Sequence, residues 1–462
     1  MKHHAPPRTL LDRLWDTHVI QRLEDGVDLL RIDRHLLPDL AGVISLEDMQ
    51  TRHLQVYRPD LTVGIMDHAV STAPDRELLP TAQSRRFLPA MRQLCKSQGI
   101  PLFDQDDTRH GIVHVVAPEL GLTLPGLTIV CGDSHTCTHG AFGALAWGIG
   151  SSEVTHVLAT QSIRQRKPQS SRVRLFGCLP TGVDAKDVAL FCLARLGVDF
   201  GIGSAIEYAG PVVDSMSMDQ RQTLCNLSVE MGAKFALIAP DNTTFNFIQG
   251  LPHAPTPEQW PAALAEWLSL RSDDDAVFVK DVIIDCSMLA PQVTWGTSPD
   301  QGIDVTQRVP TQAGSELALE YMGLSAGQFM TELAVNHVFI GSCAGGRLED
   351  LQRAAAIVRG RRIHPQVQMW VVPGSAAVKR NAEALGLDRV FIDAGAQWRH
   401  SGCSMCAASN GEKLVPGQRC VSTTNRNFAG RQGPGVRTHL ASPATAAASA
   451  LMGYIADPRT RA

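Results

Sequence analysis

Short apolar runs alternate along the chain with longer stretches of helical periodicity, and most of the short runs end in turns rich in Gly, Ser, Pro or Asp. Apolar runs of this length between turn signals are typical of strands buried in a parallel sheet. Their alternation with helices indicates an α/β fold with largely parallel sheets. The pattern predicts strands at 127–131, 235–239, 338–340, 368–372 and 390–392, and helices at 348–358, 376–385 and 441–451.

Two polar stretches rich in turn-forming residues, 165–172 and 296–302, interrupt this pattern. A chain of 462 residues has room for roughly three domains of about 150 residues each. We therefore expect three α/β domains, at 1–170, 171–296 and 297–462. Because ligands of open parallel sheets bind at the carboxyl ends of the strands, functional residues are expected in the turns that follow them.

The composition is that of a soluble globular protein, with 44% hydrophobic and 19% charged residues. Lys and Arg (42) nearly balance Asp and Glu (46), so the charge gives no reason to expect a nucleic acid or an anionic membrane as partner. No apolar stretch reaches the roughly 18 residues of a membrane-spanning helix, and the first residues lack the apolar core of a signal peptide. These features predict a cytoplasmic protein.

Eleven cysteines are scattered along the chain. In a reducing compartment such thiols stay free or bind metal, and a disulfide framework is not expected. Five of them lie in apolar or helical surroundings and are expected to be small buried hydrophobic residues. These five are Cys95, Cys178, Cys192, Cys225 and Cys286.

Three further cysteines lie in predicted turns. Cys343 follows the strand 338–340, and Cys403 and Cys406 form a C-x-x-C pair in the sequence GCSMC. Such a pair by itself is compatible with a zinc, redox or iron–sulfur role. A structural zinc site needs four protein ligands, and no second C-x-x-C pair supplies them. Three thiolates suit a [4Fe–4S] cluster with one open iron, which can act as a Lewis acid. Spacing alone leaves a structural or zinc role open.

Acid–base candidates precede and follow the strand 127–131. Asp133, Ser134 and His135 lie in the turn after it, and polar side chains this dense at a strand end need hydrogen bonds or a function. Upstream, adjacent Asp67 and His68 offer a carboxylate that could tune an imidazole for proton transfer. Taken singly, an ordinary loop hydrogen bond explains each of these motifs equally well.

Near the C-terminus, Asn425, Arg426 and Arg431 lie in the sequence NRNFAGR. The planar guanidinium group of Arg matches a carboxylate with two hydrogen bonds, so two such residues could clamp a dicarboxylate. A solvated basic loop is the alternative. Two more candidates, His114 and Glu207, are individually more typical of structural residues.

All these motifs occur together in one order: DH (67–68), GIVH (111–114), DSHT (133–136), EY (207–208), GSC (341–343), GCSMC (402–406) and NRNFAGR (425–431). With RIDRH (31–35) and PQVTWGT (291–297), the series resembles the aconitase superfamily, especially its isopropylmalate dehydratase branch, over nearly the whole chain. The resemblance implies three α/β domains around a central [4Fe–4S] cluster, one per subunit. It assigns the cluster to Cys343, Cys403 and Cys406, acid–base chemistry to Asp67, His68, His114, Asp133, Ser134, His135 and Glu207, and substrate binding to Asn425, Arg426 and Arg431.

The activity implied by the resemblance is that of a hydro-lyase. It isomerises 2-isopropylmalate to 3-isopropylmalate by dehydration and rehydration, a step of leucine biosynthesis. The alternatives are a related hydro-lyase acting on another 2-substituted malate (homoaconitase, methylmalate or citraconate type, or a paralogue in specialised metabolism) and a non-catalytic homologue without a cluster. In either enzyme the substrate is a small hydroxy-dicarboxylate or hydroxy-tricarboxylate.

Single-chain aconitases carry a fourth, swivelling domain, and this chain ends shortly after 451–454. By resemblance, a separate small subunit supplies that domain in a heterodimer or higher assembly, and the large subunit alone is expected to be inactive. The chain also departs from the family pattern. Ala344, Gly345 and Gly346 stand where Thr-Asn-Ser is usual, and Ala69 where the branch usually has Asn. Fewer hydrogen bonds around the cluster and an altered substrate are the expected consequences.

Overall fold

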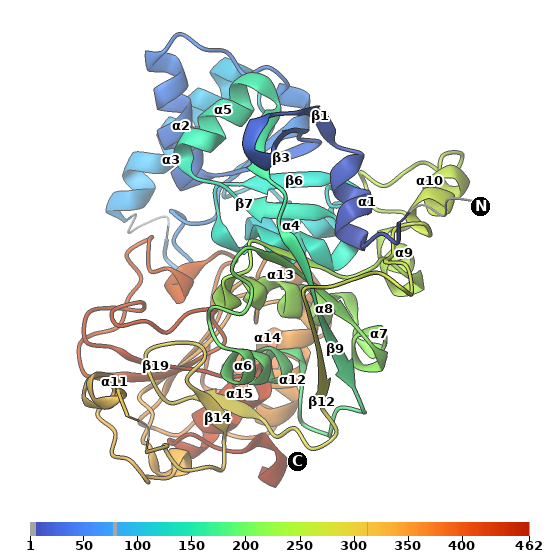
Figure 1. Cartoon of the computed structure of the whole chain (residues 1–462). Coiled ribbons are helices and arrows are strands. Elements are labelled where there is room, and N and C mark those ends of the chain that lie inside the picture. Colours follow the sequence, from blue (N-terminus) through green and yellow to red (C-terminus); the bar gives the residue numbers. More distant parts are fainter. Residues whose placement is uncertain (1–5, 77–80, 312, 462) are drawn as a thin grey trace.

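Three parallel sheets organise the computed structural model, which describes residues 6–76, 81–311 and 313–461 (Figure 1). The first has the order β5 (Leu102–Phe103), β4 (Thr62–Ile65), β3 (Arg34–Pro38), β6 (Thr128–Cys131) and β7 (Leu145–Gly148). The second has the order β11 (Phe235–Leu237), β10 (Ser204–Ala209), β9 (Gln169–Phe176) and β12 (Lys280–Asp285). The third has the order β17 (Gln397–Trp398), β16 (Gln368–Val371), β15 (His337–Ile340), β18 (Arg419–Ser422) and β19 (Arg437–Leu440).

Two small antiparallel sheets complete the strands of the described residues. One joins β1 (Val19–Arg22), β2 (Val27–Arg31) and β8 (Ser162–Arg166), and the other joins β13 (Gln292–Thr294) and β14 (Gly302–Asp304). The predicted dividing stretches lie at the end of β8 and the start of β9, and between β13 and β14. The domain limits 1–170, 171–296 and 297–462 stay a prediction.

Helices connect the strands and cover the sheets. The α-helices are α1 (Leu10–Asp16), α2 (Asp39–Thr51), α3 (Ala82–Gln98), α4 (Val113–Glu119), α5 (Ser151–Thr160), α6 (Ala185–Leu196), α7 (Pro211–Ser215), α8 (Met218–Asn226), α9 (Asn242–Ile248), α10 (Trp260–Trp267), α11 (Glu316–Met322), α12 (Leu348–Val358), α13 (Ala376–Ala384), α14 (Leu387–Ala394) and α15 (Pro443–Met452). The 3-10 helices are η1 (Glu24–Gly26), η2 (Pro59–Leu61), η3 (Ser134–Phe142), η4 (Leu227–Met231), η5 (Met330–Glu332), η6 (Ser404–Cys406) and η7 (Pro458–Arg461). Among the described residues, none of these helices combines the length and the apolar character needed to span a bilayer.

The strands that lead into the candidate motifs are buried over their whole length. Every residue of β4, β6 and β15 is buried, as expected for parallel strands covered on both faces. Tight helix capping fixes where several connections begin. The Asp184 carboxylate, for example, accepts the backbone N–H of Lys186 at 2.9 Å and starts α6. The turns after these strands are therefore held on rigid supports.

Most of the predicted elements are confirmed within one or two residues, namely the strands at 127–131, 235–239, 338–340 and 368–372 and all three helices. The strand predicted at 390–392 is wrong, because these residues lie within α14. Buried Leu387, Phe391 and Ala394 recur at helical spacing, and so short an apolar run does not distinguish helix from strand. Cys178 is also wrongly predicted as buried, since its side chain is exposed; the other four structural cysteines are buried.

Gly140 of η3 packs closely against β11 of the second sheet. A Cβ atom added there would lie 1.7 Å from the backbone oxygen of Ala236 in β11. We expect Gly140→Ala to lower the free energy of unfolding by about 3 kcal/mol, because only a backbone shift can relieve that overlap. Urea denaturation measures the difference.

Gly302→Ala is the matched control, since its added Cβ would make only ordinary contacts, at 3.5 Å or more. Equal stability of the Gly140→Ala variant and the wild type would contradict the close approach of η3 and β11.

Candidate active site

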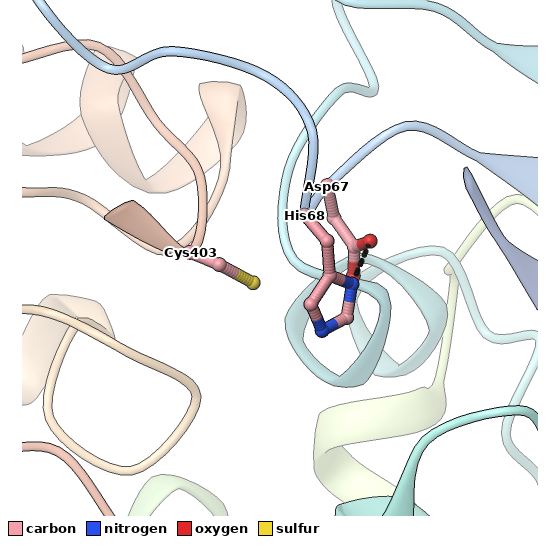
Figure 2. A group of neighbouring side chains, drawn as sticks. All are labelled: Asp67, His68 and Cys403. Atoms are coloured by element: carbon pink, nitrogen blue, oxygen red, sulfur yellow. Dashed lines mark hydrogen bonds and ion pairs between the residues drawn. The ribbon is translucent and has the colours of Figure 1, made fainter. Parts of the chain in front are cut away.

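Turns from two sheets face one another at the centre of the candidate site. Asp67 and His68 follow β4, and Asp133 follows β6, all in the first sheet. Cys343 follows β15 of the third sheet, and Cys403 lies after β17. Figure 2 shows the Cys403 side chain pointing across a gap toward His68 and Asp67. This is the carboxyl-end position at which parallel sheets bind ligands.

Asp133, which is partly exposed, is the hub of a cluster of three histidines. Its Oδ1 lies 3.0 Å from His114 Nε2 and accepts the backbone N–H of His135 at 2.7 Å. Its Oδ2 lies 3.2 Å from His68 Nε2. Burial by itself raises the pKa of Asp133, but the hydrogen bonds from His114, His135 and His68 outweigh it and hold the pKa well below the usual 3.8. Asp133 is therefore a carboxylate at neutral pH.

His68 lies between two carboxylates. Its Nδ1 is 2.5 Å from Asp67 Oδ1, the bond drawn in Figure 2, and its Nε2 faces Asp133. Burial lowers the pKa of His68, but the charges and hydrogen bonds of Asp67 and Asp133 raise it well above the usual 6.5. The ring is then an imidazolium that donates both N–H groups. This arrangement makes His68 a proton donor.

The loop carrying His68 is held by Asp39, a fully buried residue at the start of α2 that the sequence analysis missed. Its carboxylate accepts the backbone N–H groups of Asp67, His68 and Ala69 at 3.2, 3.3 and 2.8 Å. Burial, with the charge of Asp67, raises the pKa of Asp39 to about 6. Asp39 directly follows β3, so the rule that placed the other candidates after strands could have found it.

A second acidic residue, Glu230 of η4, connects His135 to Arg426. Glu230 Oε1 lies 3.1 Å from His135 Nε2 and 2.6 Å from Arg426 Nε. Burial raises the pKa of Glu230, but His135 and Arg426 outweigh it and the pKa lies below 4.5. Burial likewise lowers the pKa of His135, and Asp133 and Glu230 raise it above 6.5. The network thus extends from the first sheet to the loop after β18.

The structure does not bring Glu207 to this cluster. Glu207 lies within β10, and its Oε2 accepts a hydrogen bond from Ser272 Oγ at 2.6 Å. A residue inside a strand points to one face of the sheet, and the cluster lies at a different place, in the turns.

Two asparagine amides connect the cysteines. Asn226 Nδ2 lies 3.1 Å from Cys343 Sγ, and Asn425 lies 3.6 Å from Cys343 Sγ and 3.5 Å from Cys406 Sγ. The two amides also hydrogen-bond to each other. All three cysteines are buried. Asn226 was not among the residues predicted from the sequence. The sulfur atoms of Cys343 and Cys406 therefore lie around one pair of amides.

The cysteine turns have the chemistry of a site for a soft metal. Burial raises the pKa of Cys343 to about 11 and that of Cys403 well above 9.0, and the neighbouring cysteine sulfurs contribute to both shifts. Asp67, His68 and Cys403 each present a ligand atom within 4.8 Å of the others. Ser342 and Ser404 adopt left-handed backbone angles, φ 78° and 51°, which is strain typical of a functional turn. Three converging thiols of this kind fit an iron–sulfur cluster.

The other predicted residues lie around this centre. Ser134 is exposed beside Asp133, and no hydrogen bond of its side chain occurs among the described residues. Arg426 is about one-quarter exposed. Arg431 stacks over Phe428 at 5.4 Å, and its buried Nε has no hydrogen-bond partner in the described part of the chain. Arg431 is not in contact with the histidine cluster.

The side chain of Thr423 and the backbone of neighbouring residues pack against the turn Ala344-Gly345-Gly346. A Cβ at Gly345 would lie 2.3 Å from Thr423 Oγ1. That hydroxyl accepts the N–H of Gly341 at 3.0 Å and donates to its carbonyl at 2.9 Å. Ser342 Oγ in turn accepts the N–H of Ala344 at 3.2 Å. Hydrogen bonds from Thr423 and Ser342 thus hold the backbone that leads into this turn.

Residues 12–453 match the aconitase family (aconitate hydratase). The chain is 54% identical to the 3-isopropylmalate dehydratase large subunit 1 of Bradyrhizobium diazoefficiens, over 98% of this chain and 97% of that protein. Among solved structures it is similar to the holo-form of aconitase X from Thermococcus kodakaraensis, with 10% identity and a TM-score of 0.47 over 86% of this chain and 84% of the other.

We expect Glu230→Gln to lower the pKa of His135, because the variant keeps the shape of the side chain and removes the negative charge that favours the imidazolium. Histidine ¹⁵N chemical shifts followed against pH in the full-length chain measure this change. Glu207→Gln is the matched control and should leave His135 unchanged. The opposite ranking of the two variants would place the acidic partner of the cluster at Glu207.

Proposed function

The chain belongs to the aconitase family, and from this premise we propose that it is the large subunit of a cytoplasmic hydro-lyase that interconverts 2-isopropylmalate and 3-isopropylmalate. The observation that carries the proposal is the meeting of three buried cysteines with the imidazolium of His68, its partner Asp133 and the guanidinium of Arg426. The curated relative bears the same activity in its name over nearly the whole length of both chains.

Cys343, Cys403 and Cys406 are proposed to hold one [4Fe–4S] cluster. When bound, such a cluster offers a Lewis-acidic iron that polarises the C–O bond of a hydroxy-acid. Asn226 and Asn425 direct amide N–H groups at the sulfur of Cys343 and help to orient it. Amide hydrogen bonds of this kind fix ligand geometry and stabilise negative charge on sulfur.

His68 is proposed as the general acid of dehydration. As the C–O bond of the substrate breaks, the imidazolium gives a proton to the departing hydroxyl, and water leaves. Asp67 and Asp133 hold the ring from both sides. Their negative charges favour the imidazolium, so that His68 takes a proton back from water in the reverse step. Ser134 and His135 line the same turn. The proton on the neighbouring carbon goes to a base of the small subunit.

Arg426, with Asn425 and Arg431 in the same loop, is proposed to bind the carboxylates of the substrate. Asn427 anchors this loop by donating to the carbonyl of Gly296 at 2.7 Å. The anchored loop positions the substrate, and the guanidinium stabilises the charge that develops as the hydroxyl leaves. Arg426 is partly exposed, so a ligand can reach it.

The partner is proposed to be a small subunit carrying the swivel domain, in a heterodimer or a larger assembly. The words "large subunit" in the name of the relative support this composition. A second candidate substrate is another 2-substituted malate. It is favoured by Ala69 and by the turn Ala344-Gly345-Gly346, where polar side chains are absent beside the acid and the cysteines.

We expect the anaerobically reconstituted chain to contain about four iron atoms. It should convert isopropylmalate only after the small subunit is added. Cys403→Ser should lose most of the iron and the activity, because a hydroxyl is a poor ligand for iron in such a cluster. Cys178→Ser, at the exposed cysteine, is the control and should keep both.

Iron counting, low-temperature EPR and a panel of 2-substituted malates make up the assay. Iron at background level in the wild type would point to the non-catalytic homologue. If the enzyme converts only another 2-substituted malate, the substrate assignment is wrong and the reaction class stands.

We expect Arg426→Lys to raise KM about 10-fold to 100-fold, because Lys cannot form the paired hydrogen bonds of a guanidinium with a carboxylate. Arg58→Lys, at a surface ion pair with Asp60, is the control and should leave KM unchanged. Steady-state kinetics of the two-subunit enzyme measure both. An unchanged KM in Arg426→Lys would remove this residue from substrate binding.

A further inference from the structure

A chain of buried hydrogen bonds runs from Asp133 away from the cysteines. His114 Nε2 lies 3.0 Å from Asp133 Oδ1, and His114 Nδ1 lies 3.1 Å from His139 Nε2. His139 Nδ1 in turn lies 2.8 Å from Thr123 Oγ1. His114, His139 and Thr123 are each at most 1% exposed. The chain therefore ends inside the protein, at a hydroxyl.

The chemistry of each group fixes the direction of these bonds. A carboxylate only accepts, so the proton of His114 that faces Asp133 resides on Nε2. The two nitrogens between His114 and His139 share a single proton. With neutral His114, Thr123 donates to His139, and His139 Nε2–H donates to His114 Nδ1. When His114 gains a second proton, every bond beyond it reverses, and the hydroxyl of Thr123 accepts.

The surroundings favour an uncharged His139. Burial lowers its pKa well below 6.5, and His114 and Arg347 lower it further, whereas Asp133 opposes them. Through Asp133, the cluster also includes His68 and His135. The rings of His114 and His139 meet edge to face, with centroids 5.2 Å apart. His139 lies next to Gly140, whose contact with β11 holds η3 in place.

We propose that His139 and Thr123 are positioning residues that hold the ring of His114 so that its Nε2–H faces Asp133. They keep one oxygen of Asp133 engaged, so that its other oxygen stays aligned with His68. They also give His114 a satisfied hydrogen bond in both of its protonation states. The inference deepens the proposed function, since the reaction at His68 depends on the alignment of Asp133.

The test uses the two-subunit enzyme with matched pairs of variants. His139→Phe removes both hydrogen bonds and keeps a ring, whereas His139→Gln keeps one donor and one acceptor. Thr123→Val keeps the shape of the side chain and removes the hydroxyl, whereas Thr123→Ser keeps it. We expect kcat to fall about 10-fold to 100-fold in the Phe and Val variants, as for other residues that orient a ligand or a base. KM and iron content should stay unchanged, and Gln and Ser should restore most of kcat.

A change in the pH profile separates positioning from structural support. In His139→Phe and Thr123→Val the pH dependence of kcat should shift relative to the wild type. His35→Phe is the control, because His35 is fully buried in the first sheet and neither of its ring nitrogens is hydrogen-bonded in the described residues. It should leave the profile unchanged. Equal losses in the Phe and Gln variants, or losses without a shift in the profile, would overturn the proposal.

Nitrogen-15 NMR of histidine in the full-length chain tests the tautomer without catalysis. His114 should carry its proton on Nε2 in the wild type, and the chemical shift of its Nδ1 should move toward that of a nitrogen without a hydrogen bond in His139→Phe. If the wild-type enzyme converts no 2-substituted malate but His114 carries its proton on Nε2, the proposed function is wrong and the positioning role stands. An active wild type with a mixture of tautomers would defeat the positioning role alone.

Discussion

The carboxylate of Asp133 holds the candidate site together. A buried carboxylate without partners is unstable by several kcal/mol, and its proton affinity rises until it becomes neutral. Here three imidazoles surround it, and its pKa falls instead. Each imidazole has a further partner of its own: Asp67 for His68, Glu230 for His135 and His139 for His114. The charged groups of the site are thus stable only as a set.

The cysteine turns depend on this set through shared neighbours. Asn425 contacts the sulfurs of Cys343 and Cys406, and Arg426, the next residue, pairs with Glu230. Buried Lys186 donates to the carbonyls of Thr423 and Thr424 at 3.1 and 2.6 Å and so supports the start of the same loop. Burial lowers the pKa of this lysine to about 8. One loop therefore connects the cysteines of the candidate site to its histidine and carboxylate cluster.

The departures from the family pattern become intelligible in this setting. Loss of side chains in the turn Ala344-Gly345-Gly346 leaves no unfilled space, because Thr423 occupies it and satisfies the backbone of Gly341. Ala69 still donates its N–H to Asp39, which requires no side chain. Hydrogen bonds to Asp39 and Thr423 thus hold the backbone of both loops without help from side chains at these positions.

The sequence by itself determined the local elements and the places where chemistry is found. Apolar runs and turn residues predicted the buried strands before Asp133 and Cys343, and the density of polar residues marked both turns. It could not determine which distant residues complete the site. Asp39, Asn226, Glu230, His139 and Thr123 joined it, and Glu207 did not, because these contacts depend on strand order and on the packing of three sheets. The segment 390–392 lies in a helix because only Phe391 is buried there, in register with Leu387 and Ala394, whereas Ile392 is exposed; so short an apolar run does not show this spacing.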